Sequence, residues 1–142
     1  GTEQKNLQAQ INKLSLHKSV TLVGRKNKQE IIFYMQNTHA FILSSHSETF
    51  SVVCIEAMAQ GIPVIATACG GPEEFITKEV GILIKPSNID VLTDAMTDMY
   101  INYQSYDSKK IAKYCHDRFA PSVIAKQLIE IFNLTIERYG NE

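Results

Sequence analysis

The chain has 142 residues, of which 44% are hydrophobic and 20% are charged, and its formal net charge is -1. This composition is typical of one folded domain and argues against disorder. The balanced charge lacks the basic surplus of nucleic-acid-binding domains, so no nucleic-acid partner is expected. No apolar run approaches the roughly 20 residues that cross a membrane, and the first ten residues lack the apolar core of a signal peptide.

The cysteines, Cys54, Cys69 and Cys115, lie far apart and include no CxxC pair. An odd number of separated cysteines favours neither a zinc site nor a disulfide framework. We therefore expect free thiols, a reducing environment and a cytoplasmic location.

The first half of the chain contains two predicted helices and two predicted strands. Apolar residues at helical spacing predict helices over 4–16 and 28–37. A β-branched run closed by glycine predicts a buried strand over 20–24, and a second apolar run predicts one over 40–43.

The second half continues the same alternation. A helix over 52–60 should end at Gly61, and Pro63 prevents its continuation. Pro72 suits the first position of a short helix that follows a glycine turn. The remaining predicted elements are strands over 63–67 and 81–84 and helices over 88–102, 107–117 and 121–139.

Strands and helices alternate strictly, and the strands are uniformly apolar rather than alternating apolar and polar. This pattern predicts an α/β fold in which a Rossmann-like, doubly wound parallel sheet is covered on both faces, over residues 1–142 as one domain. Ligands bind such sheets at the carboxyl ends of the strands. Three predicted loops lie there, namely 24–26, 44–51 and 68–74.

Several polar residues in these loops could contact a ligand. Ser51 is a candidate N-cap, and its helix would direct free N–H groups at an anion such as a diphosphate. Thr49 adds a hydroxyl donor. His46 could touch the ligand or be a bystander, and the glycines Gly70 and Gly71 could admit a ligand closely or simply form a turn.

Two glutamates are the strongest candidates in this region. Glu56 lies in the apolar helical run VVCIEAMA, where it either accepts hydrogen bonds from sugar hydroxyls or faces solvent on the outer side of the helix. Glu48 lies in the preceding loop, where it faces either the ligand or water.

Glu48 and Glu56 are separated by seven residues, and the segments EAMAQGIPVIAT and CGGPEE follow. This combination resembles the retaining GT-B glycosyltransferases, which include sucrose synthases and many bacterial capsule and lipopolysaccharide glycosyltransferases. The resemblance runs from Val20 through Leu92 and implies the C-terminal, donor-binding half of a GT-B fold without its first strands. Ser44 in place of the usual Pro, and Thr49 in place of a frequent Gly, are mild departures.

The resemblance implies a role for each candidate residue. Glu56 would bind the nucleotide ribose, and Glu48 would be the catalytic-site residue near the transferred sugar. The remaining donor-binding candidates are the backbone amides of Thr49, Phe50, Ser51 and Val52 at the sugar and diphosphate, Gly24, Arg25 and Lys26 at the base, and Gly70 and Gly71 at the floor of the site.

The reaction implied by the resemblance is transfer of a glycosyl group, with retention, from a UDP-, GDP- or ADP-sugar. It implies no cofactor and no metal, and a role in surface polysaccharide or glycolipid synthesis. The family's diphosphate-binding Arg and Lys and its N-terminal acceptor domain are expected outside this chain, and the full-length protein could associate peripherally with a membrane. The chain alone is therefore expected to bind the donor without turnover.

The family's strand order, 3-2-1-4-5-6, would separate the strand at 20–24 from the others by two strands. The gap could be filled by another segment or another copy, or the strands could rearrange.

Three other functions compete with this interpretation. The chain could be a non-catalytic nucleotide-sugar-binding module or a GT-B-type epimerase, which would lack the glutamate pair, whereas an oxidoreductase would require the absent G-x-G-x-x-G. The final helix, with Ile124, Leu128, Ile131 and Phe132 on one face, should pack, with part of that face exposed.

Overall fold

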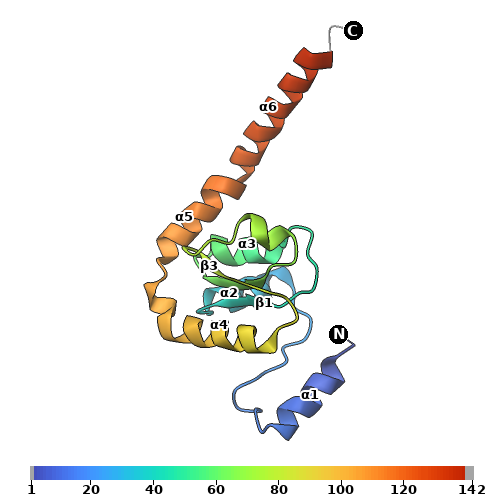
Figure 1. The fold of residues 1–142 in the computed structure, drawn as a ribbon, viewed down its shortest axis with the longest axis vertical. Helices are drawn as coiled ribbons and strands as arrows, with labels where there is room; N and C mark the ends of the chain where they lie inside the picture. Colours follow the sequence, from blue (N-terminus) through green and yellow to red (C-terminus); the bar gives the residue numbers. More distant parts are fainter. Residues whose placement is uncertain (1, 140–142) are drawn as a thin grey trace. The chain divides into compact units, whose positions relative to one another are not determined.

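The structure is a computed structural model that describes residues 2–139. The chain forms two compact units, Gly1–Tyr34 and Met35–Glu142. Figure 1 shows the elements of both units in the colours of the sequence.

The second unit is built on a parallel three-stranded sheet in the order β1-β2-β3. The strands are β1 (Phe41–Leu43), β2 (Val64–Thr67) and β3 (Gly81–Ile84). Ile65 of β2 is in register with Ile42 on one side and Ile82 on the other. Each strand agrees with a predicted one to within a residue, and the fold is the predicted α/β arrangement.

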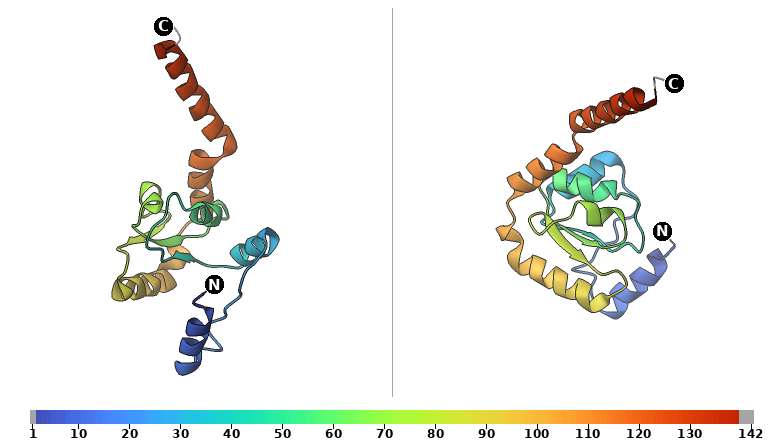
Figure 2. Two further views of the ribbon diagram at one scale, coloured as in Figure 1. Left: turned by 90° about the vertical axis from the view of Figure 1, so that its right-hand side faces the viewer. Right: turned by 45° about the horizontal axis from the view of Figure 1, so that its top comes forward.

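Helices cover both faces of the sheet. The helices α3 (Val52–Ala59) and α5 (Ser108–Phe119) pack on one face, and α4 (Ile89–Asn102) lies on the other (Figures 1 and 2). Side chains alternate between the faces of a strand. Val64 and Ala66 accordingly join the cluster with Met58 and Ile111, whereas Ile65 joins the cluster with Ala95 and Met99. All four residues of β2 are buried, which explains why the central strand is apolar up to its last residue, Thr67.

Polar side chains fix the starts of the later helices. The Asn88 side chain accepts a hydrogen bond from Val91 N at 3.0 Å and caps α4. The Asp107 carboxylate accepts from Lys109 N at 3.0 Å and Lys110 N at 3.2 Å and caps α5. Short 3₁₀ turns lie at η1 (Gly71–Glu74) and η2 (Tyr103–Ser105).

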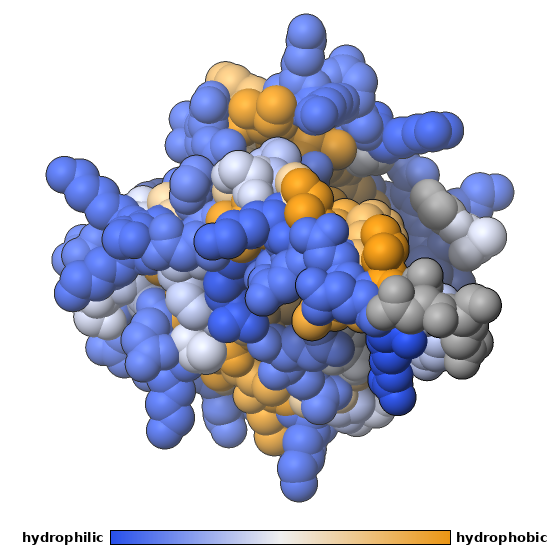
Figure 3. All heavy atoms as spheres, turned by 90° about the horizontal axis from the view of Figure 1, so that it is seen from above, coloured by the Kyte–Doolittle hydropathy of each residue, from blue (hydrophilic) through white to orange (hydrophobic). Residues whose placement is uncertain are grey.

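The last helix, α6 (Pro121–Tyr139), has no buried residue. The four apolar side chains of the predicted face are exposed, from 38% for Ile124 to 60% for Phe132, so the prediction that these side chains pack is wrong. From the side on which α6 projects, hydrophobic surface appears in patches among hydrophilic side chains (Figure 3). No helix in the described part of the chain is both long and apolar enough to cross a membrane.

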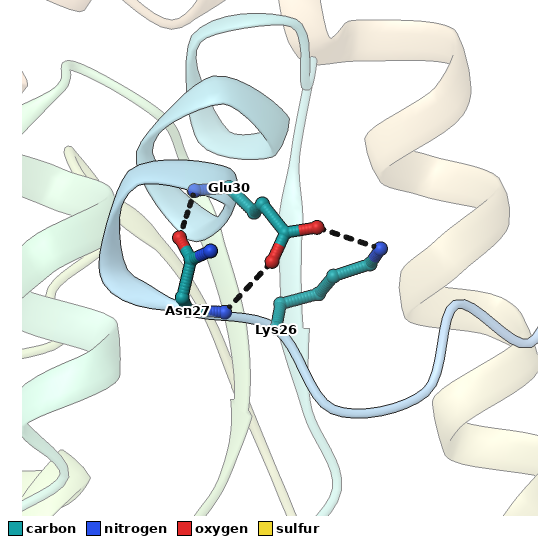
Figure 4. Close-up of polar contacts among 3 residues, drawn as sticks. All are labelled: Lys26, Asn27 and Glu30. Atoms are coloured by element: carbon teal, nitrogen blue, oxygen red, sulfur yellow. Dashed lines mark hydrogen bonds and ion pairs between the residues drawn. The ribbon is translucent and has the colours of Figure 1, made fainter.

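The first unit contains α1 (Gln4–Lys13) and most of α2 (Lys28–Gln36). Asn27 and Glu30 cap α2 reciprocally: Glu30 N donates to Asn27 Oδ1, and Asn27 N donates to Glu30 Oε2, both at 3.0 Å (Figure 4). Lys26 Nζ also contacts Glu30 Oε1 at 3.0 Å. This arrangement satisfies donors that the first turn of a helix leaves unpaired.

The predicted strand over 20–24 is wrong. Among residues 2–139 no strand pairs with this segment, and its apolar side chains are largely exposed, with Val20 at 40% and Val23 at 43%. β-branched residues favour strands chiefly because they pack against neighbouring strands. Without such a neighbour the segment stays irregular. The sheet therefore consists of β1, β2 and β3 within the described residues.

Candidate functional site

The three parallel strands direct their carboxyl ends to one edge of the sheet, as open α/β sheets do where they bind ligands. Residues 44–51 follow β1, residues 68–70 follow β2 and continue into η1, and residues 85–88 follow β3. The structure thus brings together two of the three loops that the sequence singled out, and adds the loop after β3.

The loop after β1, residues 44–51, is fastened to the chain that follows β2. Thr67 Oγ1 donates to the Ser45 carbonyl oxygen at 2.5 Å. Glu48 and Gly70 form an isolated parallel bridge. Glu48 N donates to the Cys69 carbonyl oxygen at 3.0 Å, and Gly71 N donates to the Glu48 carbonyl oxygen at 3.2 Å. Both backbone polar groups of Glu48 are therefore hydrogen-bonded to the neighbouring segment, as they would be in a strand.

The two glutamates have different surroundings. Glu48 is half-buried, and its Oε1 accepts a hydrogen bond from Ser45 Oγ at 2.7 Å, which orients the carboxylate. Glu56 is exposed on α3, on a surface that solvent reaches and that a ligand could also reach. Val52 lies one turn earlier on the same face of α3 and is likewise exposed, at 59%. This face is open to a ligand.

Ser51 occupies the N-cap position of α3 as predicted, but its side chain does not cap the helix. Its backbone is left-handed (φ 66°, ψ 62°), an uncommon conformation for a non-glycine residue. The side chain is buried, and Oγ donates to Cys54 Sγ at 3.4 Å. Burial raises the pKa of the Cys54 thiol, which stays protonated. The N–H groups at the start of α3 thus receive no side-chain cap and can bind an anion.

Thr49 is exposed, whereas the neighbouring Phe50 side chain packs against two other phenylalanine rings. The Phe50 ring lies edge-on to Phe75 at 5.9 Å and to Phe119 at 5.8 Å between ring centroids. Phe75, which follows η1, is only 1% exposed. Phe50 therefore anchors the loop through its side chain, and its backbone stays at the edge of the sheet.

The glycine pair allows two backbones to lie together. A β-carbon on Gly70 would overlap the Glu48 carbonyl oxygen, and Gly70 has a φ of 121°. A β-carbon on Gly71 would overlap the Phe50 backbone. Gly70 and Gly71 thus allow the backbone of the loop after β1 to pack directly against them.

The remaining predicted residues lie elsewhere or make other contacts. Gly24 and Arg25 belong to the first unit, at the end of the irregular segment 20–24 and directly after it, and are exposed. His46 Nδ1 is 3.1 Å from Ser87 Oγ, which links the loop after β1 to the loop after β3. Within residues 2–139 no three His, Cys, Asp or Glu side chains form a group that could hold a metal ion.

Sequence reasoning missed the residues that hold the loop, which are Ser45, Thr67, Phe75, Ser87 and Phe119. Thr67 could have been suspected, because a hydroxyl ends an otherwise apolar strand beside the predicted site. The Phe119 contact spans 69 positions, and no local pattern in the sequence indicates it.

Residues 1–116 match the family described as glycosyl transferases group 1. The chain belongs to this family. It is 30% identical over 113 residues to a putative teichuronic acid biosynthesis glycosyltransferase of Bacillus subtilis, covering 69% of this chain and 29% of that protein.

Solved structures share the fold. Sucrose-phosphate synthase from Thermosynechococcus elongatus superposes with a TM-score of 0.82 and 26% identity, covering 97% of this chain and 35% of that one. Anabaena HepE in complex with UDP gives a TM-score of 0.79 and 26% identity, covering 93% of this chain and 38% of that one. The chain therefore spans about a third of the length of these glycosyl transferase relatives.

Proposed function

We propose that this chain is the donor-binding part of a glycosyltransferase and that its ligand is a nucleotide sugar, with UDP as the favoured nucleotide. The observation that carries the proposal is the similarity to HepE, which was solved in complex with UDP and with UDP-glucose. The site would be the edge formed by the loops after β1, β2 and β3.

The residues at this edge suit the proposed ligand. The uncapped N-terminus of α3 offers N–H groups and a positive dipole end to a diphosphate. Glu56 on the exposed face of α3 would accept hydrogen bonds from the ribose hydroxyls. Glu48, oriented by Ser45, would lie near the transferred sugar.

The proposed reaction of the full-length protein is transfer of the sugar to an acceptor with retention of configuration. The similarity to a putative teichuronic acid glycosyltransferase favours a surface polysaccharide as the product. A cation that stabilises the leaving diphosphate, and the groups that bind the acceptor, would come from outside this chain. By itself the chain would act as a nucleotide-sugar-binding module.

Calorimetric titration of the chain with UDP, GDP and ADP tests the proposal. We expect saturable binding of UDP, weaker binding of the other two nucleotides, and tighter binding of at least one UDP-sugar than of UDP. At one hundred times its dissociation constant, a ligand should also stabilise the fold by about 2.7 kcal/mol, which is visible as a raised Tm.

Preference for GDP or ADP would reassign the donor while leaving the class of site intact. Failure of all three nucleotides, at concentrations up to several millimolar, in a chain that unfolds cooperatively would contradict the proposed function.

A further inference from the structure

Three phenylalanines from distant parts of the second unit meet edge-on. Phe50 lies in the loop after β1, Phe75 follows η1, and Phe119 is the last residue of α5. The ring centroids are 5.9 Å apart for Phe50 and Phe75, 5.8 Å for Phe50 and Phe119, and 5.6 Å for Phe75 and Phe119. Edge-to-face geometry at these separations is favourable for each pair.

The end of α5 also contacts the chain after β2 through polar groups. Tyr114 Oη donates to the Phe75 carbonyl oxygen at 2.8 Å. Arg118 Nη2 donates to the Glu74 carbonyl oxygen at 3.3 Å, and its guanidinium lies 5.9 Å from the centroid of the Phe119 ring. The last six residues of α5 therefore contact both η1 and the aromatic cluster.

Phe50 is 41% exposed. Its two ring partners are Phe75 and Phe119. Phe75 has further contacts in the core, whereas Phe119 is only half-buried. Removal of the Phe119 ring would thus free one side of Phe50 and remove one contact of Phe75, whose other contacts in the core would remain.

We propose that Phe119 is a positioning residue for the donor site: its ring, at the end of α5, holds Phe50 and thereby the backbone of residues 48–51 in the geometry that binds the nucleotide sugar. Phe119 does not itself lie in the loops that would contact the ligand. This inference rests on the proposed function for its effect on affinity, but its effect on the loop is independent of any ligand.

The test compares Phe119→Leu with Met99→Val, a matched control. Both changes shorten an apolar side chain by a similar volume, and Met99 is a buried residue of α4 in the cluster on the opposite face of the sheet. Phe119→Tyr keeps the ring and serves as the conservative variant. The readouts are thermal unfolding, amide hydrogen exchange without ligand, and UDP affinity.

We expect the amides of Glu48 and Gly71, which bond across the two loops, to exchange about tenfold faster in Phe119→Leu, the size of effect that an aromatic pair can contribute. UDP affinity should fall by about the same factor. Met99→Val should lower the Tm without either change, and Phe119→Tyr should behave like the unsubstituted chain.

Equal exchange at Glu48 and Gly71 in Phe119→Leu and Met99→Val would overturn the positioning role. If the unsubstituted chain binds no nucleotide, the proposed function fails, and the exchange data still decide whether Phe119 holds the loop. Faster exchange with unchanged UDP affinity would overturn the link between the loop geometry and binding.

Discussion

Gly71 lies so close to Phe50 that a β-carbon on Gly71 would overlap the Phe50 Cα. The first residue of η1 is thus packed directly against the loop that precedes α3. Gly71 N also donates to the Glu48 carbonyl oxygen. The close approach and the hydrogen bond together define the geometry of the candidate site.

Gly71→Ala should push the two loops apart. We expect a loss of roughly 2 kcal/mol or more in the free energy of unfolding, of the size seen when a tightly packed site is overfilled, and loss of nucleotide binding. Chemical denaturation and calorimetric titration measure the two effects.

Gly24→Ala is the control without steric overlap, because a β-carbon there meets nothing within 4 Å, although Gly24, unlike Gly71, has a positive φ, of 66°. It should cost only about 1 kcal/mol of backbone strain. Equal losses in both variants would mean that the contact with Phe50 is unimportant.

Glu56→Gln should weaken nucleotide binding by about tenfold or more, because an amide is a poorer acceptor for ribose hydroxyls than a carboxylate. Glu56 is exposed, so the Tm should hardly change. The control is Glu130→Gln, which makes the same change on the exposed α6. Titration with UDP gives the comparison, and unchanged affinity in Glu56→Gln would remove Glu56 from the proposed site.

The elements of the second unit could be predicted from the sequence because each carries a local signal. The apolar run of β2, the proline at the start of η1 and the polar cap Asn88 each mark an element boundary that the structure reproduces to within a residue or two. The segment 20–24 carries the same kind of signal, but a strand also needs a neighbour, and the sequence of one segment does not state whether the neighbour is present.

The sequence predicted which loops form the candidate site, but it did not predict how their side chains are oriented. The loops at the carboxyl ends of β1 and β2 follow from the parallel sheet. The orientation of individual side chains does not, because it depends on contacts made by residues far away in the chain. Ser51 reads as a capping residue, yet a left-handed backbone turns its hydroxyl to Cys54. Phe50 reads as part of the ligand site, yet its ring turns to Phe119.

The three cysteines should differ sharply in their reactivity. Cys54 and Cys115 are buried, and burial raises the pKa of each thiol, so neither should react in the folded chain. Cys69 is half-buried in the loop after β2, where its carbonyl oxygen bonds Glu48 N. Alkylation followed by mass spectrometry should modify Cys69 first, and UDP should slow that modification. Labelling of Cys54 at the same rate would contradict the buried packing beneath α3.

The cap of α2 should be sensitive to acid. Hydrogen bonding to the Asn27 backbone N–H, and then to Lys26, lowers the pKa of Glu30 from its ordinary value of about 4.3. A carboxylate whose folded pKa is lowered stabilises the fold fully above the unfolded pKa, and this contribution is lost as the pH falls through the folded pKa. NMR titration of the Glu30 carboxyl carbon should therefore give a pKa below the ordinary value. Lys26→Met should raise this pKa only partway, because the larger contribution from the Asn27 N–H remains, and an ordinary pKa in the unsubstituted chain would mean that the cap does not form.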